Sequence, residues 1–217
     1  MEEIEESINI ILIGETAVGC QQLSNITSSF VFLDGENCCT SWKFNTRTMF
    51  IKNKKYEINL YNGPGEKLFY GMNILFLKNS DVVIFVYDIT RRHTFLELNN
   101  YINRAIEVLG DKFIGAIVGN KFDLYLYEQV TEKEVEELAN KYGYKFKFVS
   151  AKCDPESFIS FLEELCIDYL KDLNFFSRNK TFIDKERIKK EKKNYFERKN
   201  NLEGTNFKLF LSKYFNY

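Results

Sequence analysis

An α/β fold, doubly wound around a mostly parallel six-stranded sheet with helices on both faces, is predicted by two features of the 217-residue sequence. Short apolar runs rich in isoleucine, valine and phenylalanine alternate along the chain with longer stretches of helical spacing. Each run also stops just before glycine or polar residues, as buried strands of a parallel sheet do. Strands that alternate with helices form βαβ units, and these units build a parallel sheet covered on both faces.

The predicted strands follow from the apolar runs, taken in order. The first run, 8–13, is rich in isoleucine and is bounded by Gly14. The second and third runs are joined by a Lys-Asn-Lys-Lys tip, which indicates an antiparallel hairpin. The six predicted strands are 8–13, 46–50, 56–60, 81–87, 113–118 and 145–149. Helices are expected at 95–108, 131–142 and 157–173.

Composition places these elements in one domain, residues 1–177, followed by an extension, residues 178–217. The chain is 45% hydrophobic and has a formal net charge of -1, so it has no general attraction to nucleic acid. The extension carries twelve basic and five acidic residues and is compatible with helix. Its last part has an apolar stripe at helical spacing, formed by Phe207, Phe210, Leu211, Tyr214 and Phe215. A solvated linker and a peripheral membrane contact are both consistent with the basic run.

The five cysteines form neither a disulfide framework nor a metal-binding spacing. Nothing at the N-terminus resembles a signal peptide, and no apolar run approaches the roughly 18 residues that span a bilayer. A cytoplasmic protein is therefore expected.

The first loop after a strand has the glycine spacing of a phosphate loop. The segment Gly14-Glu-Thr16-Ala-Val18-Gly19-Cys20-Gln21 matches G-x-x-x-x-G-K-[ST] except in its last two residues. In that motif backbone N–H groups cradle phosphate, the lysine supplies charge, and the hydroxyl binds Mg²⁺. Neither Cys20 nor Gln21 can do the last two tasks. On its own the spacing is also consistent with a tight strand-to-helix turn.

Two later loops predict recognition of guanine. The strand at 113–118 is followed by Gly119-Asn120-Lys121-Phe122-Asp123, and the strand at 145–149 by Ser150-Ala151-Lys152. A carboxylate such as that of Asp123 accepts from two adjacent donors on the guanine edge, whereas adenine presents the opposite pattern. In open α/β sheets ligands bind beyond the carboxyl ends of the strands, and both loops follow directly on predicted strands.

With these loops and the run Val86-Tyr-Asp-Ile-Thr-Arg-Arg-His-Thr-Phe95, residues 8–173 resemble the Ras superfamily, and Rab proteins in particular. The resemblance implies the P-loop small GTPase fold, GTP or GDP as ligand, effector or trafficking proteins as partners, and endomembranes as a location. It implies that Asp123 reads guanine, that Asn120 and Lys121 brace that loop and the ring, and that the Ala151 N–H meets the guanine carbonyl oxygen. Phe32 falls where the family places an aromatic against the base, but it could equally belong to the core.

The chain departs from the family at the phosphate and magnesium positions. Asn62 stands in place of the magnesium-holding carboxylate, Glu66 in place of the water-orienting glutamine, and Cys39 in place of the first-switch threonine. Thr16 stands where the family prefers glycine. With Gln21, Cys39 and Asn62 at the metal positions we expect weak or no Mg²⁺ binding, and with Glu66 we expect no catalytic residue.

Three functions remain open from the sequence. The leading hypothesis is an atypical or pseudo-GTPase of vesicle traffic that acts through protein interactions, with hydrolysis very slow or absent. The alternatives are a slow GTPase that uses substitute residues such as Thr40 and Lys67, and a scaffold module that binds no nucleotide. The sequence ends in Asn216-Tyr217 without a cysteine, so no prenyl anchor is expected.

Overall fold

The computed structural model of the chain describes residues 6–29, 32, 43–63, 76–110 and 113–179. The chain divides into two compact units, residues 1–172 and 173–217. Of the second unit only residues 173–179 are described, as the end of a helix. The fold below is that of the first unit, and the boundary expected after residue 177 stays a prediction.

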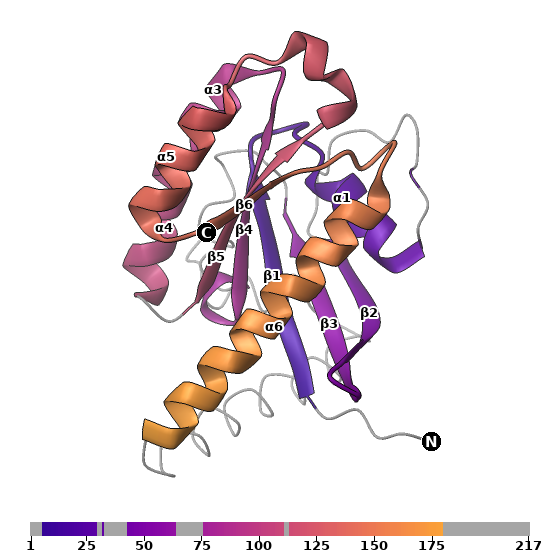
Figure 1. Ribbon diagram of the computed structural model, residues 1–217, viewed down its shortest axis with the longest axis vertical. Coiled ribbons are helices and arrows are strands. Elements are labelled where there is room, and N and C mark those ends of the chain that lie inside the picture. Colours follow the sequence, from indigo (N-terminus) through magenta and orange to yellow (C-terminus); the bar gives the residue numbers. More distant parts are fainter. Residues whose placement is uncertain (1–5, 30–31, 33–42, 64–75, 111–112, 180–217) are drawn as a thin grey trace, which may run out of the picture. The chain divides into compact units, whose positions relative to one another are not determined.

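A six-stranded sheet with the strand order β2-β3-β1-β4-β5-β6 forms the centre of the fold, which confirms the predicted class (Figure 1). Only the neighbours β2 and β3 are antiparallel, and they form the predicted hairpin. The strands are β1 (Glu6–Gly14), β2 (Lys43–Ile51), β3 (Lys54–Asn62), β4 (Val82–Asp88), β5 (Ile114–Asn120) and β6 (Lys145–Phe148). The carboxyl ends of β1, β3, β4, β5 and β6 therefore share one edge of the sheet.

The helices agree with the prediction less closely. The stretch predicted as one helix, 95–108, is two, and the residue between them, Glu97, keeps helical angles of φ -68 and ψ -17. The limits of α1 were not predicted, because that helix is mostly polar and buries only Leu23 and Ile26 among its large apolar residues. The short 3-10 helix η2 was not predicted either. The described helices are α1 (Cys20–Ser29), α3 (Arg92–Leu96), α4 (Leu98–Leu109), η2 (Phe122–Tyr127), α5 (Glu132–Tyr142) and α6 (Pro155–Asn179).

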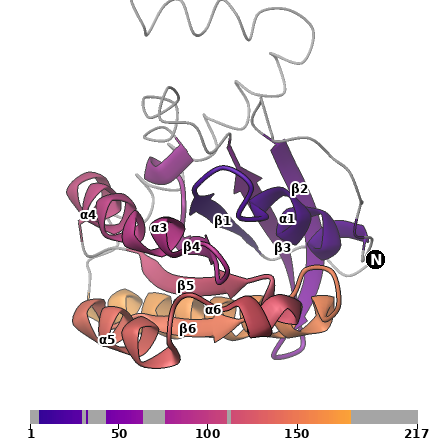
Figure 2. The ribbon, with the colours of Figure 1, turned by 90° about the horizontal axis from the view of Figure 1, so that it is seen from above.

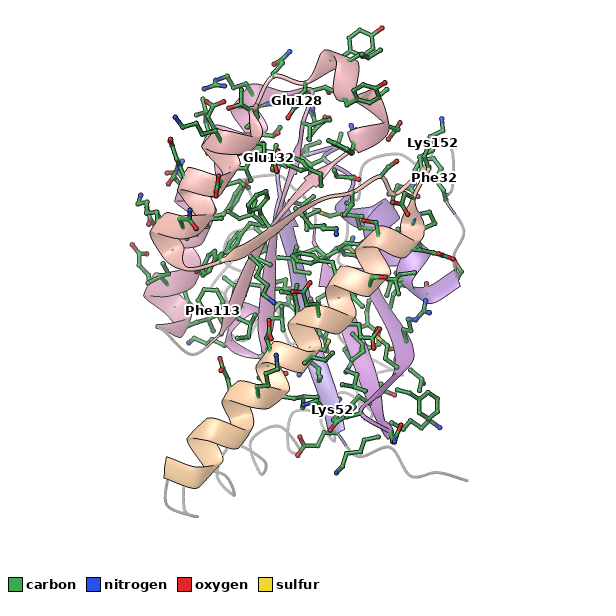
Figure 3. The ribbon with its side chains drawn as sticks, in the orientation of Figure 1. Phe32, Lys52, Phe113, Glu128, Glu132 and Lys152 are labelled. Atoms are coloured by element: carbon green, nitrogen blue, oxygen red, sulfur yellow. The ribbon has the colours of Figure 1, made fainter. Side chains whose placement is uncertain are left out.

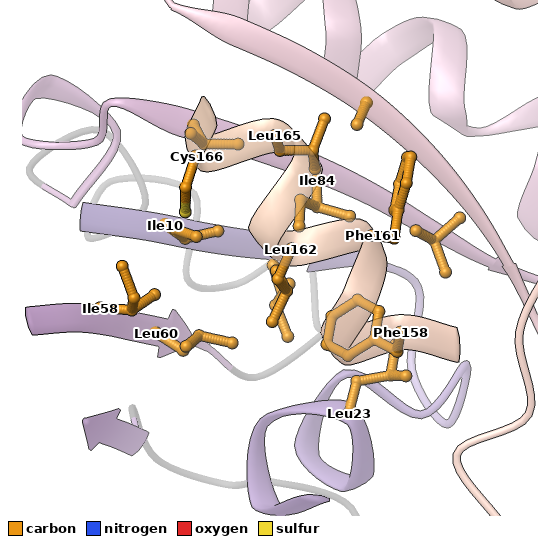
Figure 4. Packing of buried hydrophobic residues seen from close by; sticks show 14 of the residues in the cluster. Ile10, Leu23, Ile58, Leu60, Ile84, Phe158, Phe161, Leu162, Leu165 and Cys166 are labelled. Atoms are coloured by element: carbon orange, nitrogen blue, oxygen red, sulfur yellow. The ribbon is translucent and has the colours of Figure 1, made fainter. Parts of the chain in front are cut away.

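Two hydrophobic clusters, one on each face of the sheet, hold the helices in place. On one face α1 and α6 pack against the sheet; Phe158 of α6 lies beside Leu23 of α1, and Cys166 of α6 lies beside Ile10 of β1 (Figure 4). On the other face α3, α4 and α5 contribute side chains such as Phe95 and Leu138. Figure 2 shows α4 and α1 on opposite sides of β1. Within the described residues no helix is long and apolar enough to cross a membrane.

Candidate functional site

The phosphate loop runs from the end of β1 to the start of α1, and its two glycines are required by close backbone approach. A Cβ on Gly14 would lie 2.2 Å from the carbonyl oxygen of Val86 in β4. Gly19 has φ +104, and a Cβ there would lie 2.2 Å from Nδ2 of Asn120. Ala17, at φ 62, also has a left-handed conformation. Residues 17 and 19 are thus both left-handed, and the Val18 N–H donates to the carbonyl oxygen of Glu15 within the loop.

Two positions assigned to magnesium by the family resemblance are bonded to each other instead. Nδ2 of Asn62, at the end of β3, donates to Oε1 of Gln21 at 3.1 Å. Nε2 of Gln21 in turn donates to Oδ1 of Asn25 at 2.7 Å. Both groups are neutral amides, and Asn62 is fully buried. Mg²⁺ prefers carboxylates, phosphates and water in octahedral geometry, so this pair does not fit the ion.

Cys20, at the lysine position of the motif, is half-buried and packs against the core cluster that includes α1 and α6. A thiol in that setting supplies no positive charge to the loop. No group of three or more His, Cys, Asp or Glu that could hold a metal was found in the part of the chain that the structure describes. Cys39 and Glu66, with the substitutes Thr40 and Lys67, lie outside the described residues.

Asn120 joins the phosphate loop to both guanine loops. Its Nδ2 donates to the carbonyl oxygen of Val18 at 2.9 Å, and its Oδ1 accepts from the backbone N–H of Ala151 at 3.2 Å. The side chain is almost fully buried. The Ala151 N–H that the resemblance assigns to the guanine carbonyl is thus engaged by Asn120 in this structure. The bond is at the long end of the range for N–H···O, so a base could share or replace it.

Asp123 and Ser150, named from the sequence as members of two separate guanine loops, are in direct contact. The Ser150 hydroxyl donates to Oδ1 of Asp123 at 2.6 Å, and the backbone N–H of Cys153 donates to the same hydroxyl at 2.9 Å. This arrangement fixes one carboxylate oxygen of Asp123. The other oxygen has no hydrogen bond within the described residues. A carboxylate that recognises the edge of a ligand needs such an oxygen to accept hydrogen bonds from it.

Lys121 makes an ion pair that the sequence analysis missed. Its backbone is left-handed, at φ 66, and its Nζ lies 2.7 Å from Oδ2 of Asp88, a buried carboxylate at the end of β4. Burial raises the pKa of Asp88, but hydrogen bonds from Lys121 and Thr90 outweigh it and hold this pKa below its ordinary value. Asp88 follows directly on a predicted strand, and this position at the carboxyl edge was the signal that could have identified it.

Arg91 is a second missed residue, and it connects Asp88 to the phosphate loop. Its Nε lies 2.9 Å from Oδ2 of Asp88, and its Nη2 donates to the carbonyl oxygen of Thr16 at 3.1 Å. One buried carboxylate therefore holds two cations, Lys121 beside the guanine loop and Arg91 beside the phosphate loop.

Phe32 fits both interpretations that the sequence left open. It is half-buried and packs against the core, and Nζ of Lys152 lies 5.9 Å from the centre of its ring (Figure 3). This contact brings Phe32 beside Lys152, in the loop that contains Ser150 and Ala151.

Comparison with known proteins bears on the family of this chain. The model of the Ras family matches residues 9–165. The chain is 32% identical to the Ras-related protein Rab-21 of Geodia cydonium over 143 residues, 66% of this chain and 62% of that protein. It is 28% identical to human Ras-related protein Rab-21 over 165 residues, 76% of this chain and 71% of that protein. It is also 28% identical to Ras-related protein Rab-2B of Dictyostelium discoideum over 151 residues, covering 68% and 73% respectively.

Proposed function

This chain belongs to the Ras family, as a Rab-like member, and on that premise we propose that it binds guanine nucleotide almost independently of Mg²⁺ and does not hydrolyse it at a significant rate. It would then be an atypical or pseudo-GTPase that acts in vesicle traffic through protein partners. The observation that carries the proposal is the hydrogen bond between Gln21 and Asn62, which joins two neutral amides at positions where the family resemblance implies magnesium ligands.

Guanine binding is supported by the loops that Asn120 joins. The pairing of Asp123 with Ser150 orients a carboxylate toward the donor edge of a guanine, and Asn120 couples that loop to the backbone of the phosphate loop. The loop backbone supplies N–H donors for phosphate without a lysine or a metal ion. Loss of one charge-assisted hydrogen bond weakens affinity by roughly 10- to 100-fold, so binding weaker than that of a complete phosphate site is expected.

Identification of bound nucleotide tests the first part of this proposal. Protein purified without added nucleotide is denatured, and the released small molecules are separated by chromatography. Calorimetry with GDP, GTP and ATP, each with Mg²⁺ and with EDTA, then measures selectivity. We expect GDP and GTP to bind with affinities that change little on adding EDTA, and ATP not to bind. No binding of any nucleotide would favour the scaffold alternative, and a strong requirement for Mg²⁺ would contradict the proposal.

We predict no intrinsic hydrolysis above the background rate. Phosphoryl transfer is catalysed mainly by positioning and by charge stabilisation, and Cys20, Gln21, Asn62 and Glu66 replace the groups that would supply both. Phosphate release is measured in a single turnover, with protein in excess over GTP, beside a relative that has the complete motifs. A rate equal to that of the relative would support the slow-GTPase alternative and contradict the proposal.

A further inference from the structure

A run of large apolar side chains is exposed beside the guanine loops. The most exposed members belong to η2: Leu126 is 80% exposed, Tyr127 71% and Tyr125 58%. We call the exposed large apolar side chains of this helix the η2 patch: Phe122, Leu124, Tyr125, Leu126 and Tyr127. Isolated exposed apolar residues are ordinary, but a contiguous group with a polar border is typical of an interaction surface.

The border of the η2 patch carries two uncompensated negative charges. The side chains of Glu128 and Glu132 are exposed, and neither has an ion pair or a side-chain hydrogen bond within the described residues. Burial and the charge of Glu132 raise the pKa of Glu128. Their neighbour Glu134 is instead paired with Arg92. Figure 3 shows Glu128 and Glu132 at one end of the molecule. A partner suited to this surface therefore combines an apolar side chain with positive charge.

The turn between β2 and β3 has that combination of side chains. Phe50 is 60% exposed, and Lys52 is exposed two residues later. Neither Lys52 nor Lys55 has an acidic partner among the residues that the structure describes. We call Phe50, Lys52 and Lys55 the hairpin tip.

The two surfaces lie at opposite ends of the sheet. The η2 patch follows the carboxyl end of β5, whereas the hairpin tip precedes β3, whose direction is parallel to β1, β4 and β5. Figure 3 shows Lys52 far from Glu128. One molecule cannot bring its own tip to its own patch, but two molecules can.

We propose that the hairpin tip of one copy of this chain docks on the η2 patch of a second copy. Phe50 contacts the exposed tyrosines and Leu126, while Lys52 and Lys55 face Glu128 and Glu132. Because the contact joins two different surfaces, it is head-to-tail, and it leaves one free tip and one free patch at the two ends of each dimer. Few side chains are involved on each side, so the association is weak. Salt screens the contacts of the lysines with the glutamates, so the association decreases at high salt.

Sedimentation velocity of the full chain tests this inference over a range of roughly 10 to 300 micromolar, which brackets weak association. We expect the weight-average sedimentation coefficient to rise with concentration and to fall when salt is added. Leu126→Ser in the patch and Lys52→Glu in the tip should each weaken association by about tenfold or more. Leu96→Ser and Lys78→Glu are matched controls at exposed positions outside both surfaces. They should leave the association between copies unchanged.

Mixing the two variants distinguishes this contact from other contacts between copies. The Leu126→Ser protein keeps an intact tip and the Lys52→Glu protein keeps an intact patch, so an equimolar mixture should form dimers but no longer species. A wild-type protein that stays monomeric at the highest concentration would overturn the proposal. A Lys52→Glu protein that associates as strongly as the wild type would also overturn it, because the patches would then pair with each other. An equimolar mixture that stays monomeric would overturn it as well.

Discussion

Arg91 is the cation that the structure attaches to the phosphate loop, where Cys20 has replaced the lysine of the motif. Its Nη2 donates to the carbonyl oxygen of Thr16 at 3.1 Å, while its Nε is held by Asp88. In a trans peptide the C=O and N–H groups point to opposite sides. The bond from Arg91 therefore directs the N–H of Ala17 away from the guanidinium and fixes the orientation of this peptide in the loop.

We predict that Arg91→Ala weakens GDP binding by about 3- to 30-fold, the range for loss of one hydrogen bond or charge-assisted contact. Arg91→Lys should recover only part of the affinity, because an ammonium cannot contact Asp88 and Thr16 in the same fork geometry. Calorimetry with GDP and with guanosine measures the effect. Guanosine lacks the phosphates, so its affinity should not change. An equal loss for both ligands would mean that the substitution distorts the whole site.

At the residue scale, the sequence predicted the side chains that belong to a recognised pattern. Asp123 and Ser150 were both named as guanine-loop residues, and the structure shows that they are bonded at 2.6 Å, a contact that the sequence did not predict. The ion pair of Asp88 with Arg91 is local, three residues apart, and was not predicted. The pair of Asp88 with Lys121 was also not predicted, because it depends on which side chains two separate loops bring together. The amide pair of Gln21 and Asn62 was missed for the same reason: each was identified as a lost ligand, and neither sequence position indicates the new partner.

At the element scale, the bond from Asn62 to Gln21 links the end of β3 directly to the first turn of α1. Such a link does not require an ion, and it would have to be removed before a metal could bind there. Restoring one magnesium ligand without the others should therefore lower the free energy of unfolding. A carboxylate at position 62 would be buried, and the Gln21 amide would have to turn over and give up its hydrogen bond to Asn25 in order to donate to it.

We predict that Asn62→Asp alone lowers the free energy of unfolding by about 1–3 kcal/mol without creating Mg²⁺ dependence. The triple variant Cys20→Lys, Gln21→Ser and Asn62→Asp should gain Mg²⁺-dependent GDP affinity, because the three groups act as a unit. Denaturant unfolding and calorimetry with and without EDTA measure the two effects. If Mg²⁺ does not change the GDP affinity of the triple variant, the backbone of the loop does not form a phosphate site.

The ion pair of Arg92 with Glu134 joins the start of α3 to the first turn of α5. Glu134 also completes a capping box with Thr131. Hydrogen bonds from Arg92 and Thr131 lower the pKa of Glu134 to about 2. Because this folded-state pKa is depressed, the contribution to stability is present above the unfolded value near 4.3 and is lost as pH falls toward about 2.

We predict that Arg92→Ala raises the pKa of Glu134 toward the ordinary range while leaving part of the depression, since the bonds to Thr131 remain. Nuclear magnetic resonance measures the pKa of Glu134 from the chemical shift of its carboxyl carbon as a function of pH. Lys133→Ala, which removes an exposed cation paired with Glu137, is the control. A pKa that does not move in Arg92→Ala would show that the ion pair does not form in solution.

Elements with a strong apolar pattern were predicted well from the sequence, and those without one were not. The isoleucine-rich strand β1 and the hairpin of β2 and β3 were found to within a few residues. The helix α1 has few apolar residues, so its limits could not be assigned from periodicity. η2 was treated as loop because it is short and buries none of its side chains, which removes the periodic signal altogether.

At the scale of the whole molecule, the candidate site consists of loops at one edge of a sheet whose two faces are covered by packed helices. Asn120 and Asp88 connect these loops, and nucleotide would add further contacts across them. A ligand that binds only the folded chain stabilises it by mass action, so the unfolding temperature reports binding to the whole domain.

We predict that GDP raises the unfolding temperature of the full chain equally in Mg²⁺ and in EDTA. At a concentration about a hundredfold above Kd, the ligand adds about 2.7 kcal/mol to the free energy of unfolding. For a domain of this size that corresponds to a rise of roughly 5–10 °C. Differential scanning calorimetry measures the shift, with ATP as the control for nucleotides that lack the guanine edge and Asp123→Ala as the control for the base-reading carboxylate. ATP should leave the unfolding temperature unchanged, and Asp123→Ala should remove most of the rise with GDP. A rise that appears only with Mg²⁺ would mean that the chain still holds the metal through residues other than Gln21 and Asn62, and no rise at all would favour a module that works without nucleotide.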